Sequence, residues 1–237
     1  MGSAGGSTGY TGSINKEIGY NKENVENIRE EINNQAQDTA KQIVSDINSI
    51  VSSISELWFS EVAVEYFKEF ANDVSSYAPK ITNAFEQFNQ KIAEAGAEWA
   101  AKTEGEAPNL APIDPVTLDI DISPIKAVNA GGDRYITTGL AEEVSSLVSI
   151  AKGDITEYIT DIAERADVSL AFIGGEQSEG VRNCASALKQ YVEDMLSFLD
   201  SGEHSIVSKL EAYDTEYQRT AQSNVDLFTD SAFTDVQ

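Results

Sequence analysis

Apolar residues recur every three or four positions along most of this 237-residue chain. That spacing places them on one side of an α-helix, so each run of them predicts a long amphipathic helix. Two tripeptides, Trp58-Phe59-Ser60 and Phe172-Ile173-Gly174, divide the runs. Because two runs meet end to end at each tripeptide, each tripeptide marks a point where two helices fold back on one another. The pattern predicts an all-α chain with two long antiparallel helical hairpins.

The four runs predict four helices. They cover residues 25–57, 62–99, 140–170 and 181–217, so the chain should reverse at 57–62 and again at 171–177. Pro79 interrupts the second run without changing its phase. Proline removes a backbone donor and clashes with the preceding turn, so we expect a kink near residues 75–78 rather than the end of the helix.

The stretch 104–132 breaks the helical spacing, because it contains four of the five prolines and the pair Gly131-Gly132. Inside it, apolar and polar residues alternate. This period of two indicates an extended segment with one face against an apolar surface. The alternating apolar residues are Val116, Leu118, Ile120 and Ile122. A structureless loop of this length is uncommon, so we expect this connector to be held along the helices.

These boundaries divide the chain into five parts. Residues 1–13 are rich in Gly, Ser and Thr and should form a flexible N-terminus. Residues 14–103 form the first predicted hairpin, 104–132 the connector, 133–227 the second predicted hairpin and 228–237 a polar C-terminal tail.

The net charge excludes some classes of partner. With 40 acidic and 16 basic side chains, the chain carries a formal charge of −24 at pH 7. Nucleic acids and anionic membrane surfaces are bound mainly through Lys and Arg, so we expect neither as a partner. The chain has no apolar run long enough for membrane insertion, and its N-terminus lacks the basic and apolar regions of a Sec signal. If the protein is exported, we expect a different route.

Residues that could support catalysis are scarce. The chain has one cysteine, Cys184, and one histidine, His204. Twenty positions on a single helix would separate them by about 30 Å, too far for a nucleophile and its base. One His and one Cys do not make a metal site of the usual spacing, and the abundant carboxylates fall on polar helix faces. We therefore predict a protein that is not an enzyme and needs no cofactor or metal.

The first tripeptide and the residues after it resemble the WXG100 family of type VII (ESX) secretion systems. Trp58-Phe59-Ser60 is followed by Ala63, Phe67 and Phe70 and by Pro79 in mid-helix, as in the second helix of that family. In the second half, Phe172-Ile173-Gly174 precedes Val181 by the offset that separates Trp58 from Phe67. Ser60 replaces the glycine of the signature in the first copy, and Phe172 replaces the tryptophan in the second.

The resemblance implies a tandem duplicated hairpin. WXG100 proteins are dimers of hairpins that form a four-helix bundle. Two copies in one chain could form an elongated four-helix bundle as a pseudo-dimer, with the connector as a covalent substitute for dimerisation. Such a chain would be monomeric.

The resemblance also implies a function through protein–protein contacts. The protein would be secreted without a Sec signal, or associated with a type VII system, as substrate, partner or export adaptor. Its partners would be a secretion ATPase, a cognate toxin or another WXG100-like protein. The family places a Tyr-x-x-x-acid signal after the second helix, so Tyr213, Tyr217 and Phe228 are candidates for recognition. None of the nine tyrosines, however, has an acidic residue four positions later. The alternative is a cytoplasmic or phage-borne structural protein that assembles helical rods.

Overall fold

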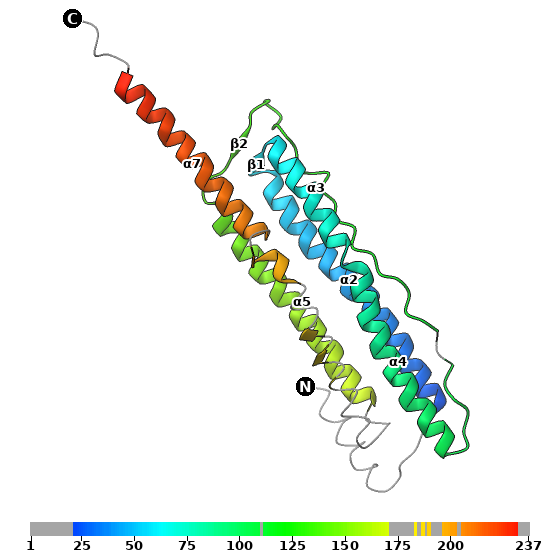
Figure 1. Ribbon diagram of the computed structural model, residues 1–237. Coiled ribbons are helices and arrows are strands. Elements are labelled where there is room, and N and C mark those ends of the chain that lie inside the picture. Colours follow the sequence, from blue (N-terminus) through cyan, green and yellow to red (C-terminus); the bar gives the residue numbers. More distant parts are fainter. Residues whose placement is uncertain are drawn as a thin grey trace, which may run out of the picture. The chain divides into compact units, whose positions relative to one another are not determined.

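The computed structural model describes residues 21–109, 111–170, 183, 186–187, 189–190, 196–202 and 205–231. These residues are mostly helical, which confirms the expected all-α class apart from one short two-stranded sheet (Figure 1). The elements in chain order are α2 (Lys22–Ser55), β1 (Trp58–Phe59), α3 (Glu61–Ser75), α4 (Ala78–Lys102), β2 (Tyr135–Ile136), α5 (Leu140–Leu170), the 3₁₀ helix η1 (Leu196–Leu199) and α7 (Ile206–Ser231).

Several of the predicted features lie outside the described residues. They are the N-terminal segment 1–13, the second reversal with Phe172, Ile173 and Gly174, the side chains of Cys184 and His204, and residues 232–237.

The chain forms two compact units. The first comprises residues 1–45, 73–119 and 152–195, and the second comprises residues 46–72, 120–151 and 196–237. In the first unit, the N-terminal part of α2 runs antiparallel to α4 (Figure 1). In the second unit, the C-terminal part of α2 runs antiparallel to α3 (Figure 1).

The apolar run predicted for the first helix is confirmed in α2. Its members from residue 25 to residue 54 are all buried: Val25, Ile28, Ile32, Ala36, Ala40, Ile43, Ile47, Ile50 and Ile54. Burying one isoleucine side chain favours folding by about 1.5–3 kcal/mol before entropy is counted. A helix of 34 residues is therefore held in place by its buried face rather than by helix propensity.

The second helical run is divided at Pro79. We expected a kink without a stop, but α3 ends at Ser75, the chain turns at residues 76–77, and α4 begins at Ala78. Pro79 lies in the first turn of α4, where its missing N–H needs no helical partner. The prediction about phase holds, because Val74, Ala78 and Ile81 are all buried across the break.

The C-terminus of α4 places a non-glycine residue in a left-handed conformation. Glu104 has φ 53° and is the one described non-glycine residue with a positive φ. The next N–H, that of Gly105, donates to the carbonyl of Ala100 at 2.8 Å, as in a Schellman motif. Glu104, and not the glycine that follows it, therefore adopts the left-handed conformation that glycine would adopt without strain.

The first reversal is built differently from a tight turn. Trp58 and Phe59 are extended in β1, where Trp58 pairs with Ile136 and Phe59 with Tyr135 in an antiparallel ladder. The N–H of Thr137 also donates to the carbonyl of Leu57 at 2.8 Å. The segment between the connector and α5 therefore holds the reversal in place, a contact that the sequence did not predict.

Ser60 explains how the reversal proceeds without the glycine of the family signature. Its hydroxyl accepts a hydrogen bond from the N–H of Ala63 at 3.0 Å. This contact satisfies a free donor in the first turn of α3, so Ser60 acts as the N-cap of that helix. A cap residue has a negative φ, and no left-handed residue is needed here.

The connector is extended, as its alternation predicts. Val116 and Leu118 are buried, whereas Thr117 and Asp119 are exposed. Residues 116–122 do not form a strand. The non-helical stretch continues past the expected end at residue 132, because β2 and a turn precede the start of α5 at Leu140.

The fourth apolar run is not one continuous helix. The chain leaves the helical conformation between η1 and α7, where Gly202 has φ 96°. Cys184 and His204, which we expected to share this helix, both lie outside the described residues. The predicted C-terminal tail also begins too early, since α7 continues through residues 228–231.

Candidate functional site

The side chain of Trp58 is the centre of an aromatic cluster in the second unit. It is 0% exposed, and its ring centroid lies 6.5 Å from that of Tyr66 and 6.4 Å from that of Phe67, both on α3. The ring of Tyr213 on α7 is nearer still, at 5.0 Å. Trp58 therefore packs the reversal against α7 as well as against α3.

Trp58 contributes through packing rather than polar contacts. Its indole Nε1 is buried and has no hydrogen-bond partner among the described residues. Beside Tyr213, the Oδ2 atom of Asp214 accepts a hydrogen bond from the N–H of Gly139 at 3.4 Å, just before α5. The neighbouring Phe59 is half-buried and packs against Tyr135 with 5.1 Å between the ring centroids.

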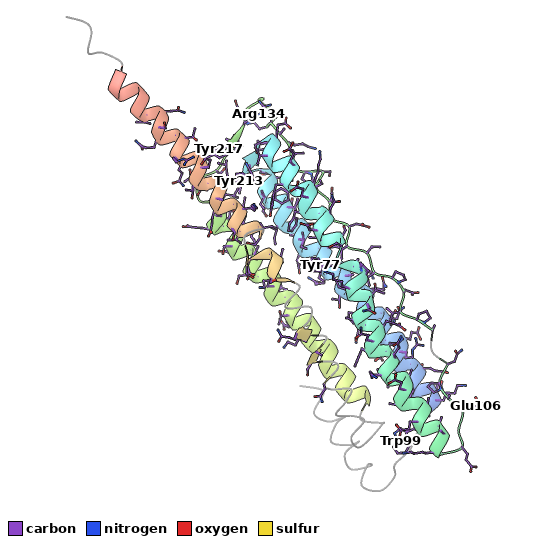
Figure 2. All side chains as sticks on the ribbon, viewed as in Figure 1. Tyr77, Trp99, Glu106, Arg134, Tyr213 and Tyr217 are labelled. Carbon is purple, nitrogen blue, oxygen red and sulfur yellow. The ribbon has the colours of Figure 1, made fainter. Side chains whose placement is uncertain are left out.

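The three residues predicted for export or partner recognition have different environments. Tyr213 is half-buried against Trp58, so its role is at least partly structural. Tyr217 lies one turn further along α7 and is 37% exposed (Figure 2). Residues 215–225 of α7 are all exposed, which leaves this face accessible. Phe228 lies in the same helix, but its side chain is outside the described residues.

A second cluster, which sequence reasoning missed, surrounds the extended connector. We call residues 109–121 the strap. Among the described residues, no main-chain group of the strap pairs with another main-chain group. Helix side chains pair with the strap instead. In the first unit, four strap N–H groups donate to helix oxygens: Asn109 to Glu26 Oε1 at 2.8 Å, Ile113 to Glu86 Oε2 at 2.7 Å, Asp114 to Asn33 Oδ1 at 2.8 Å and Val116 to Thr82 Oγ1 at 3.0 Å.

Helix side chains also donate to carbonyl groups of the strap. Gln37 Nε2 on α2 binds the carbonyl of Asp114 at 2.9 Å, and Ser75 Oγ at the end of α3 binds the carbonyl of Leu118 at 2.8 Å. The strap therefore has hydrogen-bond partners for its main chain without belonging to a helix or sheet.

Beneath the strap, a buried polar network joins α2 to α4. The Nε of Arg29 donates to Asn89 Oδ1 at 2.6 Å, and Asn89 Nδ2 donates to Glu86 Oε2 at 3.3 Å. Arg29 is 8% exposed and Asn89 2%. Burial lowers the pKa of Arg29, and the negative charges of Glu86 and Glu26 partly restore it. The guanidinium stays charged because its pKa begins far above neutrality.

Asn33 makes two contacts with one strap residue. Its Oδ1 accepts from the N–H of Asp114, and its Nδ2 donates to the carboxylate Oδ2 of Asp114 at 3.0 Å. A cavity of about 360 Å³ lies beside this contact, lined by α2 and the strap. Glu26, Glu30 and Asp114 line it together with Arg29. The charged groups of this lining are thus three carboxylates and one guanidinium.

The N-terminal side of the strap is held by an exposed ion pair. Lys22 Nζ lies 2.9 Å from Glu106 Oε2, and this contact lowers the pKa of Glu106. The position of Glu106 beyond the end of α4 is visible in Figure 2. Exposed pairs of this kind contribute little to stability.

Within the described ranges, no group of three or more His, Cys, Asp or Glu side chains is placed to hold a metal ion. No helix in the described part of the chain is long and apolar enough to cross a membrane.

The sequence carried only a weak signal for the strap contacts. Asn89 lies next to Phe88 in the buried run, where a polar residue is out of place and needs a partner. By contrast, Asn33, Gln37 and Thr82 look like ordinary polar residues of a helix surface. The contacts also join positions far apart in the sequence, so no local pattern reveals them.

Comparisons with protein-family models, curated proteins and solved structures gave no match to this chain.

Proposed function

We propose that this is a non-enzymatic, WXG100-like protein of a type VII secretion system that acts through protein–protein contacts as a substrate, partner or export adaptor. One observation carries the proposal. Trp58 is fully buried at the point where a 34-residue helix gives way to returning helices of 15 and 25 residues. A buried tryptophan at the reversal of a long hairpin is what the resemblance implies for this family.

The proposal includes a partner surface on α7. The exposed residues 215–225, with Tyr217 among them, are accessible to a secretion ATPase, a cognate toxin or another WXG100-like protein. Tyr213 is a poorer candidate, because its ring packs against Trp58. Tyr217 can therefore be changed with little effect on folding, which makes it the sharper probe of recognition.

We further propose that the second half of the chain forms a hairpin that packs on the first as a pseudo-dimer. The amphipathic run of residues 140–170 supports this idea, since its first members Leu140, Val144 and Val148 are buried in α5. Sedimentation of the full-length chain tests the proposal. A monomer across a hundredfold range of concentration is expected, and an obligate dimer would contradict it.

Secretion in the native host tests the main proposal. Deleting the type VII ATPase should abolish extracellular protein, while a Sec-dependent protein is still exported and a cytoplasmic marker stays inside. Removing residues 218–237 should reduce export and leave the rest of the chain helical, because residues 218–225 are exposed. Tyr217→Ala should also reduce export, with Thr220→Ala, at a nearby exposed position of α7, as the matched control.

Retention of the protein inside the cell, with the ATPase present and expressed, would refute the proposal. In that case the alternative, an intracellular or phage-borne protein that assembles helical rods, would take its place. Pelleting of purified protein as filaments would then be the direct measurement.

A further inference from the structure

The contacts between the strap and the side chains of α2, α3 and α4 resemble those by which proteins recognise an extended peptide. Helix side chains reach the main chain at Asn109, Ile113, Asp114, Val116 and Leu118. Main-chain hydrogen bonds bind an extended peptide whatever its side chains are, and pockets for alternate side chains add specificity.

The strap also presents a defined pattern of side chains. Ile113 and Val116 are each 4% exposed and Leu118 is 1% exposed, so the side chains of these three apolar residues are buried. Asp114 is exposed, but its carboxylate is bound by Asn33. The strap therefore reads apolar-Asp-x-apolar-x-apolar from residue 113 to residue 118.

The prolines in the strap suit it to bind in this way. Pro112 and Pro115 have no N–H, and both are exposed between the residues whose N–H groups are bound. Proline also restricts the free segment to extended conformations, so less entropy is lost when it binds. These are the properties of an extended ligand that is preorganised for its site.

We propose that the surface of α2 and α4 that carries Asn33, Glu86 and Thr82 is a binding site for an extended polypeptide segment of the pattern apolar-Asp-x-apolar-x-apolar, and that the chain's own strap occupies and closes this site in cis. The proposal is independent of the secretory function. It assigns the connector a role as a resident ligand. A short covalent link gives such a ligand an effective concentration of about a millimolar, so a segment added in trans competes poorly while the strap is bound.

A labelled peptide of residues 109–121 added to full-length variants tests the proposal. Val116→Asp places a charge at a buried strap position and should open the site, whereas Thr117→Asp changes the exposed neighbour and should leave it closed. Fluorescence anisotropy should show that the peptide binds the Val116→Asp protein at least roughly tenfold more tightly than the wild type or the Thr117→Asp protein. Equal binding to all three, or none to the opened protein when its circular dichroism is unchanged, would overturn the proposal.

Variants of the helices show whether the peptide uses the proposed site. In the Val116→Asp background, Asn33→Ala removes both contacts with Asp114 and should weaken peptide binding by about tenfold. Asn34→Ala, at the exposed neighbouring position, should have no effect. Loss of binding with both variants, or with neither, would mean that the peptide binds elsewhere.

Hydrogen exchange of the wild type provides a second test that does not need the opened variant to fold. The amides of Ile113, Asp114 and Val116 should exchange together, in an opening that leaves the buried amides of α2 near Ile43 protected. Exchange of these strap amides only through global unfolding would show that the strap is part of the core and not a ligand, and would refute the proposal.

Discussion

Trp58→Ala and Trp58→Phe together measure how the first reversal is stabilised. The alanine variant removes a side chain that is 0% exposed and has three aromatic neighbours, Tyr66, Phe67 and Tyr213. Truncating a buried aromatic residue to alanine costs about 3–5 kcal/mol. We expect a loss in this range, because the contacts come from both α3 and α7 and neither helix can close the cavity alone.

The phenylalanine variant should be much less destabilising. It keeps one aromatic ring and removes the buried indole N–H, which has no partner among the described residues. An unpaired buried donor costs about 1–3 kcal/mol, and its removal offsets the apolar contact that the smaller ring loses, about 1 kcal/mol for some 40 Å². The free energy of unfolding of Trp58→Phe should therefore lie within about 1 kcal/mol of the wild-type value.

Urea denaturation followed by far-ultraviolet circular dichroism gives these free energies of unfolding. The comparison requires that the m-value, the dependence of the free energy on urea concentration, is the same in the variants and the wild type. Phe59→Ala is the control variant, because it truncates an aromatic residue next to Trp58. Its half-buried ring packs on Tyr135, and we expect a loss of about 1–2 kcal/mol. If Trp58→Phe is as harmful as Trp58→Ala, the indole N–H has a partner and the reasoning fails. Equal, small losses at all three variants would mean that the tripeptide acts in recognition instead.

Three further changes test single features of the fold by the same assay. Ser60→Ala should cost about 1 kcal/mol through loss of the helix cap, whereas Ser60→Gly should cost only a few tenths. Asn89→Leu should cost about 3 kcal/mol because it leaves the buried Nε of Arg29 without its partner, and Arg29→Met in the same chain should recover most of that loss. Glu104→Gly should stabilise the protein by about 0.5 kcal/mol, because glycine adopts positive φ without strain.

Each of these predictions has a contrary outcome. Equal losses for the two Ser60 variants would mean that the hydroxyl does not cap α3. An Asn89→Leu variant as stable as the wild type would mean that Arg29 is solvated rather than buried. A destabilising Glu104→Gly change would show that the side chain of Glu104 contributes more than its backbone strain costs.

The spacing of apolar residues was enough to predict α2 and its buried face. The three-to-four spacing from Val25 to Ile54 predicts α2, and all of the predicted apolar residues are buried there. The alternation around Val116 and Leu118 likewise predicts which strap residues face the core. These predictions hold because periodicity is a local property, fixed by backbone geometry and by which residues avoid water.

Local spacing was less reliable where backbone chemistry intervened. The phase of the apolar run continues through Pro79, but the helix itself does not. Similarly, the apolar residues on either side of Gly202 suggested one helix, although a left-handed glycine separates η1 from α7. The spacing of apolar residues predicts which face of a helix is buried, but it does not predict whether the backbone hydrogen bonds of that helix are continuous.

How the connector is held depends on contacts between distant parts of the chain, which local patterns do not reveal. The pairing of Trp58 with Ile136 and the bond between Asn33 and Asp114 each join residues more than 75 positions apart. Nothing in the local sequence distinguishes Asn33, which binds the strap, from Asn34, which faces solvent. Their roles differ because the strap passes beside Asn33 and not beside Asn34. The main-chain donors and acceptors of the strap need partners once they leave water.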